Sequence, residues 1–121
     1  MKLKIKQVVE SFQVLGRLGQ EKMPIKLAYI IQRNLRLLNP EYSQWDEQRT
    51  SLIKEKYGVK DEAGNYTVTP DKMPEFQTEM DTLGDVEVEL DLHTISMIAW
   101  GRDISPLDFM ILDWMILPGE E

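Results

Sequence analysis

The chain has 121 residues, no cysteine, an apolar share of 42%, a charged share of 29% and a formal net charge of −7. The length is that of one domain, and the composition is that of a globular chain and not of a disordered one. The lack of cysteine excludes disulfides and thiolate metal sites and favours a reducing compartment. No apolar run is long enough for a signal peptide or for a membrane span, so we expect one domain over 1–121 that does not enter a membrane.

The net charge hides a division between the two halves of the chain. Residues 1–60 contain 12 Lys and Arg against 6 Asp and Glu, whereas residues 61–121 contain 2 against 15. Such asymmetry could mark a nucleic-acid face or an acidic mimic of nucleic acid. We favour the simpler interpretation that the halves pack together with their opposite charges facing, so we do not expect nucleic acid as a partner.

Two segments have the alternation of a strand with one buried face. Lysines alternate with apolar residues over 2–6, and carboxylates alternate with valine and leucine over 85–92. If the two segments pair, the lysine row lies beside the carboxylate row, and the apolar rows form one floor for helices. We therefore predict a small sheet in which the N-terminal strand pairs with residues 85–92.

Helical spacing of apolar residues first appears over 7–18 and is strongest over 24–38. Pro40 is expected to kink or divide the second of these helices, because proline removes a backbone donor and disfavours the helical state of the residue before it. A further helix then runs to about Tyr57, with aromatic residues such as Trp45 on its inner side.

The middle of the chain contains a turn, a helix and an irregular stretch. Gly64 and Asn65 tolerate turn conformations, which predicts a small hairpin or an extended loop over 60–68. A helix is expected to begin at Thr69 and Pro70 and to end before the acidic strand. Residues 93–104 have a weaker pattern and are expected to be irregular or to form a short helical turn.

The carboxyl-terminal segment is unusually apolar, with nine apolar residues among the eleven from 107 to 117. A Ser-Pro start at 105–106 predicts a helix that stops before Pro118, with apolar residues around nearly its whole circumference. Either a groove of the fold covers this tail, or it forms a contact surface for a partner, where Trp and Met are typically enriched. The predicted partner-binding residues are Phe109, Leu112, Trp114, Met115 and Ile116.

No set of side chains indicates catalysis. His93 is the only histidine, and no serine stands in a nucleophile-elbow context. Pairing with lysines explains the acidic strand more simply than a metal or glycosidase site does. We therefore expect a non-enzymatic protein without catalytic residues, metal or cofactor. The basic residues Lys26, Arg33 and Arg36 form a candidate anion-binding group, although we favour the simpler explanation of a solvated helix face.

Four stretches of the chain together resemble a group of small phage and prophage proteins of unknown function. These stretches are MPIKLAYIIQRN, RTSLIKEKYGVKDEAGNYTV, EFQTEMDTLGDVEVELDLHTI and ISPLDFMILDWMI. The resemblance covers nearly the whole chain, and KYGVKDEAGNY is its most specific part. It brings no activity, substrate or catalytic residue. It implies a phage gene product that acts in the host cytoplasm or is associated with the virion during assembly.

The sequence thus predicts a single α+β domain, in which three or four helices, including a long antiparallel pair, pack on a small sheet. The favoured function is that of a phage accessory protein working through protein contacts, by self-association or in virion assembly. The tail and helix 24–38 would make these contacts. The alternative is a counter-defence protein that inhibits a host protein or sequesters a signalling nucleotide. The expected partner is therefore a second copy, another phage protein or a host protein.

Overall fold

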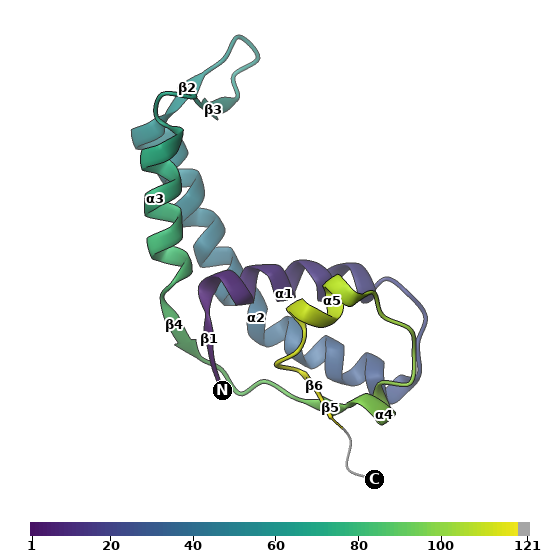
Figure 1. Ribbon diagram of the computed structural model, residues 1–121. Helices are drawn as coiled ribbons and strands as arrows, with labels where there is room; N and C mark the ends of the chain where they lie inside the picture. Colours follow the sequence, from purple (N-terminus) through teal and green to yellow (C-terminus); the bar gives the residue numbers. More distant parts are fainter. Residues whose placement is uncertain (119–121) are drawn as a thin grey trace.

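The computed structural model describes residues 1–118, which form an L of helices and small sheets (Figure 1). The helices are α1 (Ile5–Leu18), α2 (Ile25–Leu52), the π-helical turn η1 (Ile53–Tyr57), α3 (Met73–Gly84), α4 (Met97–Trp100) and α5 (Pro106–Ile111). The strands are β1 (Lys2–Lys4), β2 (Gly58–Lys60), β3 (Tyr66–Val68), β4 (Glu87–Glu89), β5 (Ile95–Ser96) and β6 (Ile116–Leu117). This mixture confirms the predicted α+β class.

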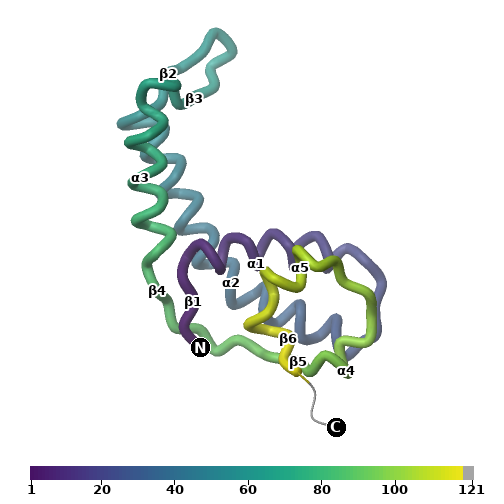
Figure 2. The backbone as a smooth tube through the Cα atoms, viewed as in Figure 1, coloured from purple at the N-terminus to yellow at the C-terminus, as the bar shows by residue number. Residues whose placement is uncertain are grey.

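The long helix α2 belongs to both limbs of the L. Its first half packs with α1 and with the segments from β5 to β6 in a part that we call the body (Figure 1). Its second half lies beside the returning helix α3 in a part that we call the arm, with the β2–β3 hairpin at the tip (Figure 2). We call the place where α1, α2 and α3 meet the elbow. The long antiparallel helical pair is thus present, although residues 1–118 form five α-helices instead of three or four.

The first strand pairs with the acidic strand as predicted. β1 and β4 are antiparallel, with Leu3 opposite Val88 and the two lysines of β1 opposite the two glutamates of β4. β1 is shorter than its lysine pattern, because α1 already begins at Ile5, where the Lys4 amide donates to the side chain of Gln7 at 2.9 Å. The sheet is also smaller than expected, since the described residues form three separate two-stranded sheets.

Pro40 does not divide the second helix. α2 runs without interruption from Ile25 to Leu52 and contains Pro40 in its interior. The proline leaves the Arg36 carbonyl without its helical donor, but Pro40 lies on the exposed side of the helix, where water can bind that carbonyl. Packing against α1 on both sides of the proline, and against α3 after it, stabilises both halves as one continuous helix.

The hydrophobic core lies in the body. Its buried members come from β1, α1, the first half of α2, and the segments that follow β4. They are Leu3, Val8, Val14, Leu15, Leu18, Leu27, Ile31, Leu38, Ile95, Trp100, Leu112, Met115 and Ile116. The arm is thin by comparison: its two buried aromatic residues, Tyr57 and Phe76, pack edge to face with ring centroids 6.0 Å apart. Most of the burial that stabilises this chain is therefore in the body.

The tip of the arm is a hairpin, the first of the two alternatives that the sequence left open, and not an extended loop. β2 and β3 are antiparallel, with Val59 opposite Thr67, and Gly64 takes a positive φ of 87° in the turn. The following helix begins at Met73, later than the Thr69–Pro70 start that was expected. Residues 93–104 contain the short elements β5 and α4, in agreement with a short helical turn.

A buried side chain of α2 fastens the segment between β4 and β5 to the body. Asn34 is fully buried, and its amide donates to the His93 carbonyl at 2.9 Å. The His93 amide in turn donates to Asn34 Oδ1 at 2.8 Å. One side chain therefore satisfies both backbone groups of a residue that lies in no helix or strand, where they would otherwise be unpaired.

The tail does not form the predicted helix from Ser105 to Pro118. α5 ends at Ile111, the chain turns, and β6 pairs in parallel with β5, with Ile116 opposite Ile95. The start was predicted correctly, since the Ser105 hydroxyl accepts from the Asp108 amide at 3.1 Å. The helix ends early because pairing with β5 and burial in the core satisfy the backbone and apolar side chains of residues 112–117 better than a longer helix would.

An ion pair connects α5 to α1. The guanidinium of Arg17 donates to Asp108 Oδ1 at 2.7 Å, and Asp108 is buried. The hydrogen bond from Arg17 lowers the pKa of Asp108, and the positive charge of Arg17 and the hydroxyl of Ser105 lower it further. The folded chain thus binds a proton at Asp108 less readily than the unfolded chain does.

Replacing Asp108 by Asn is expected to flatten the acid limb of the stability profile. The unfolded carboxyl has a pKa of about 3.9. Because the folded pKa is lower, the stabilisation is present above pH ~4 and is lost as the pH falls through the folded value. Urea midpoints measured across this range should decline less steeply for Asp108→Asn than for the parent chain. Asp113→Asn, at an exposed carboxylate, is the control, and identical acid limbs in all three proteins would refute this assignment.

Candidate functional site

The elbow is built around a row of aromatic side chains. Phe12 of α1 stacks on Tyr42 of α2 with ring centroids 4.5 Å apart, and Tyr42 lies 5.6 Å from Trp45. The guanidinium carbon of Arg49 lies 5.6 Å from the Trp45 ring, and Arg49 is itself paired with Asp46 at 2.8 Å. Trp45 is therefore held on several sides, although it is only partly buried.

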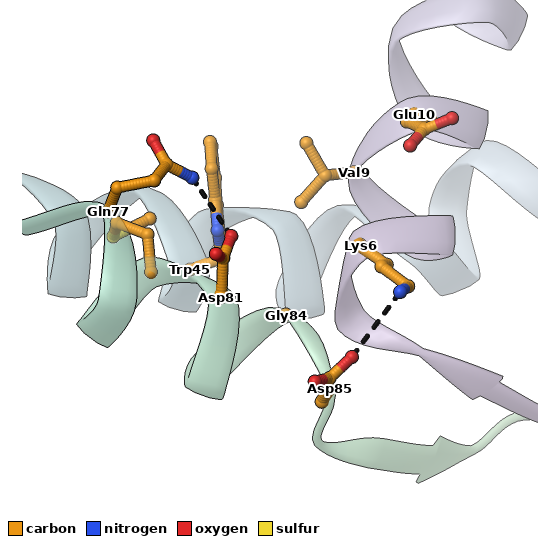
Figure 3. Close-up of a pocket in the computed structure, with 9 residues that line it drawn as sticks. Lys6, Val9, Glu10, Trp45, Gln77, Asp81, Gly84 and Asp85 are labelled. Carbon is orange, nitrogen blue, oxygen red and sulfur yellow. Dashed lines mark hydrogen bonds and ion pairs between the residues drawn. The ribbon is translucent and has the colours of Figure 1, made fainter. Parts of the chain in front are cut away.

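A hollow with a volume of about 540 Å³ lies at this elbow, between α1 and α3. Figure 3 shows Gln77 and Asp81 of α3 on one side, facing Lys6, Val9 and Glu10 of α1 on the other. Two polar contacts fix its rim: Lys6 to Asp85 at 3.3 Å and Gln77 to Asp81 at 2.9 Å. The residues that line it are Lys6, Val9, Glu10, Trp45, Gln77, Met80, Asp81, Gly84 and Asp85.

A second hollow, of about 390 Å³, lies on the other side of Trp45, between α2 and the β1–β4 sheet. Its apolar lining comes from the sheet end and α3, and its polar lining comes from α2. The apolar residues are Ile5, Leu83, Val86 and Val88, and the polar residues are Glu41, Gln44, Glu47 and Gln48. Trp45 lines both hollows and therefore stands between them.

A third hollow, of about 320 Å³, adjoins the first through Glu10 and lies against α5. It is lined by two of the most exposed apolar side chains of the chain, Leu107 at 73% and Met110 at 69% exposure. We call the three hollows together the elbow surface. Apolar groups that are exposed next to one another in this way are typical of contact sites.

The elbow surface is acidic. Six carboxylates line it, against the single cation Lys6, which is already paired with Asp85. The carboxylates are Glu10, Glu41, Glu47, Asp81, Asp85 and Asp113. A surface on which apolar side chains lie among carboxylates suits a partner that has apolar side chains surrounded by lysine and arginine.

The prediction that the tail residues bind a partner is wrong for three of them. Leu112, Met115 and Ile116 are at most 3% exposed and belong to the core, because the chain turns inward after Ile111. Phe109 and Trp114 are half-buried, and the indole of Trp114 donates to the buried Ser11 hydroxyl at 2.8 Å. A groove of the fold therefore covers most of the tail. The apolar residues that α5 leaves exposed are Leu107 and Met110.

The three predicted anion-binding residues are all exposed along the first half of α2. The guanidinium carbon of Arg33 lies 6.0 Å from the ring centroid of Tyr29. Arg36 lines a mainly apolar hollow of about 300 Å³, to which neither Lys26 nor Arg33 contributes. The structure thus places the three cations on one helix but does not gather them in one pocket.

Sequence reasoning missed the elbow surface. The sequence predicts that Trp45 lies on the inner side of its helix, but in the structure Trp45 is only partly buried. The sequence did contain a signal for this surface, because the residues that flank Trp45 in EYSQWDEQR are mostly polar or charged. A tryptophan in such a setting is typical of an interface centre as well as of a core.

Three further findings bear on the class of the protein. Within residues 1–118, no three His, Cys, Asp or Glu side chains come together as potential metal ligands. No helix in that range combines the length and the apolar character needed to cross a membrane. No protein-family model, curated protein or solved structure matches the chain. A function for this chain is therefore inferred from its own surfaces.

Proposed function

We propose that this chain is a non-enzymatic phage accessory protein that works through protein contacts made by its elbow surface. The partner is a second copy of the chain or another phage protein, met in the host cytoplasm or on the virion. The single observation that carries the proposal is the pair of hollows that share Trp45 and are lined by apolar side chains and carboxylates.

The surroundings of Trp45 support this role. Aromatic side chains held rigidly in a hollow lose little conformational freedom on binding, and tryptophan is enriched among the residues that dominate interface energies. Tyr42 and Arg49 hold Trp45 in this way on the side of α2. The exposed Leu107 and Met110 extend the apolar area toward α5.

Replacing Trp45 by Ala is expected to weaken partner binding about tenfold or more, the usual effect of truncating an interface anchor. The tagged chain is immobilised, and we measure whether it captures the untagged chain or any of the phage structural proteins. Each of these proteins is purified and tested separately. Ile98→Ala is the matched control, because Ile98 is exposed but lines none of the three hollows.

The comparison is made on variants whose circular dichroism and melting temperature match those of the parent. The proposal predicts that at least one partner is captured by the parent and by Ile98→Ala and is lost from Trp45→Ala. Equal capture by all three proteins, or no capture by any of them, would contradict it.

A further inference from the structure

The interpretation that the two halves of the chain neutralise each other is only partly correct. Several ion pairs do connect the halves: Lys6 with Asp85, Arg17 with Asp108, Lys56 with Glu79, and Arg102 with Glu21. Lys26, Arg33 and Arg36 of α2, however, form no ion pair with any residue of the described chain. Three positive charges along the first half of α2 are therefore not neutralised by ion pairs, in a protein whose net charge is −7.

The same part of α2 exposes two large apolar side chains. Ile25 is 87% exposed and Tyr29 is 59% exposed. Ile25, Tyr29 and Arg33 are spaced four residues apart, so they follow one another along one side of the helix. We call these two apolar residues, together with Lys26, Arg33 and Arg36, the basic end of α2.

The basic end complements the elbow surface in both charge and chemistry. The basic end has apolar side chains among cations, and the elbow surface has apolar side chains among carboxylates, two of which, Glu41 and Glu47, line the second hollow. An aromatic side chain such as Tyr29 carries a large apolar area and a polar tip, which suits a hollow with this lining.

The two surfaces of one molecule cannot meet each other. Ile25 and Trp45 stand on the same uninterrupted helix, twenty residues apart, so the rise of the helix separates them by about 30 Å. Figure 1 shows the start of α2 at the far end of the body from the elbow. Any contact between the basic end and the elbow surface must therefore join two copies of the chain.

We propose that the basic end of α2 in one copy docks in the elbow surface of a second copy. This inference rests on the proposed function and names its partner. Tyr29 and Ile25 enter the hollows beside Trp45, while Lys26 and Arg33 face Glu41 and Glu47. The contact joins different surfaces of the two copies, so each added copy leaves one basic end and one elbow surface open, and growth continues to a ring or a filament.

Charge reversal tests this pairing. The first variant is Lys26→Glu with Arg33→Glu, and the second is Glu41→Lys with Glu47→Lys. Each variant alone presents like charges at both surfaces, so sedimentation velocity should show a monomer. An equimolar mixture restores opposite charges across the contact, so it should sediment at least as a dimer, and added salt should weaken this association.

Two double variants at the arm are matched controls, Lys54→Glu with Lys60→Glu and Glu55→Lys with Glu62→Lys, since all four side chains are exposed and line none of the three hollows. Both should associate as the parent does. The inference is overturned if the parent is monomeric, if either reversed variant associates alone, if the mixture stays monomeric, or if the basic end binds a cyclic nucleotide and no second copy. In any of these cases, loss of a phage protein from Trp45→Ala would still uphold the proposed function.

Discussion

Truncating Leu112 to alanine is expected to lower the free energy of unfolding by about 3 kcal/mol, within the range of about 2 to 5 kcal/mol that buried leucines show. Leu112 is fully buried among the residues of the body, so the lost methyl groups leave a cavity that the surrounding side chains fill only in part. A loss of this size is a large share of the about 5 to 15 kcal/mol that stabilises a typical domain.

The matched control is Leu107→Ala, the same substitution five residues earlier in the tail. Leu107 is exposed, so its truncation should change the free energy of unfolding by less than about 0.5 kcal/mol. Urea denaturation at low protein concentration, followed by circular dichroism, measures both. Equal losses for the two variants would show that the tail does not lie in the body as described.

Replacing Asn34 by Leu is expected to cost about 3 kcal/mol of stability, despite the similar volume of the two side chains. The substitution leaves the His93 amide and carbonyl without partners, and each unpaired buried polar group costs about 1 to 3 kcal/mol. Asn34→Asp keeps the oxygen that accepts from the His93 amide but places an ionisable carboxyl in a fully buried position, so this variant should also lose stability at neutral pH.

Asn39→Leu on the exposed side of the same helix is the control and should be nearly neutral. Hydrogen exchange supplies a second measurement, because the His93 amide should lose its protection in Asn34→Leu and keep it in the control. An unchanged urea midpoint together with unchanged exchange at His93 would exclude the role given to Asn34.

The parts of the fold that follow from local pattern were predictable. The pairing of β1 with β4 follows from two alternating segments of opposite charge, and its register puts lysines opposite glutamates. The start of α5 follows from the Ser105 cap. In both cases the residues that define the element are neighbours in the sequence or share a period of two, so no tertiary information was needed.

The parts that depend on distant contacts were not predictable. The tail helix ends early because residues 116–117 pair with β5, a two-residue strand with no pattern of its own. Pro40 stays within α2 because α1 and α3 pack against this helix and stabilise the segments before and after the proline. The elbow surface forms where α1, α2 and α3 meet, so its hollows come from the angle between body and arm and not from any one segment.

The sequence predicted the kind of candidate site, an apolar contact surface, but not the residues that form it. The excess of apolar groups near the end of the chain predicted a contact surface that includes Leu112, Met115 and Ile116, but the fold buries these three residues and exposes Leu107 and Met110. Burial along a tail depends on which direction the chain takes after its last helix, and the residue types alone do not determine that direction.

The most direct test of self-association is the average molecular mass of the unmodified chain in solution. Light scattering coupled to size exclusion, over a wide range of protein concentration and at low and high salt, gives this mass. The account predicts a value that rises above the 14.1 kDa of one chain as concentration increases and that returns toward it in high salt. A mass of 14.1 kDa at every concentration and salt would contradict the account of self-association.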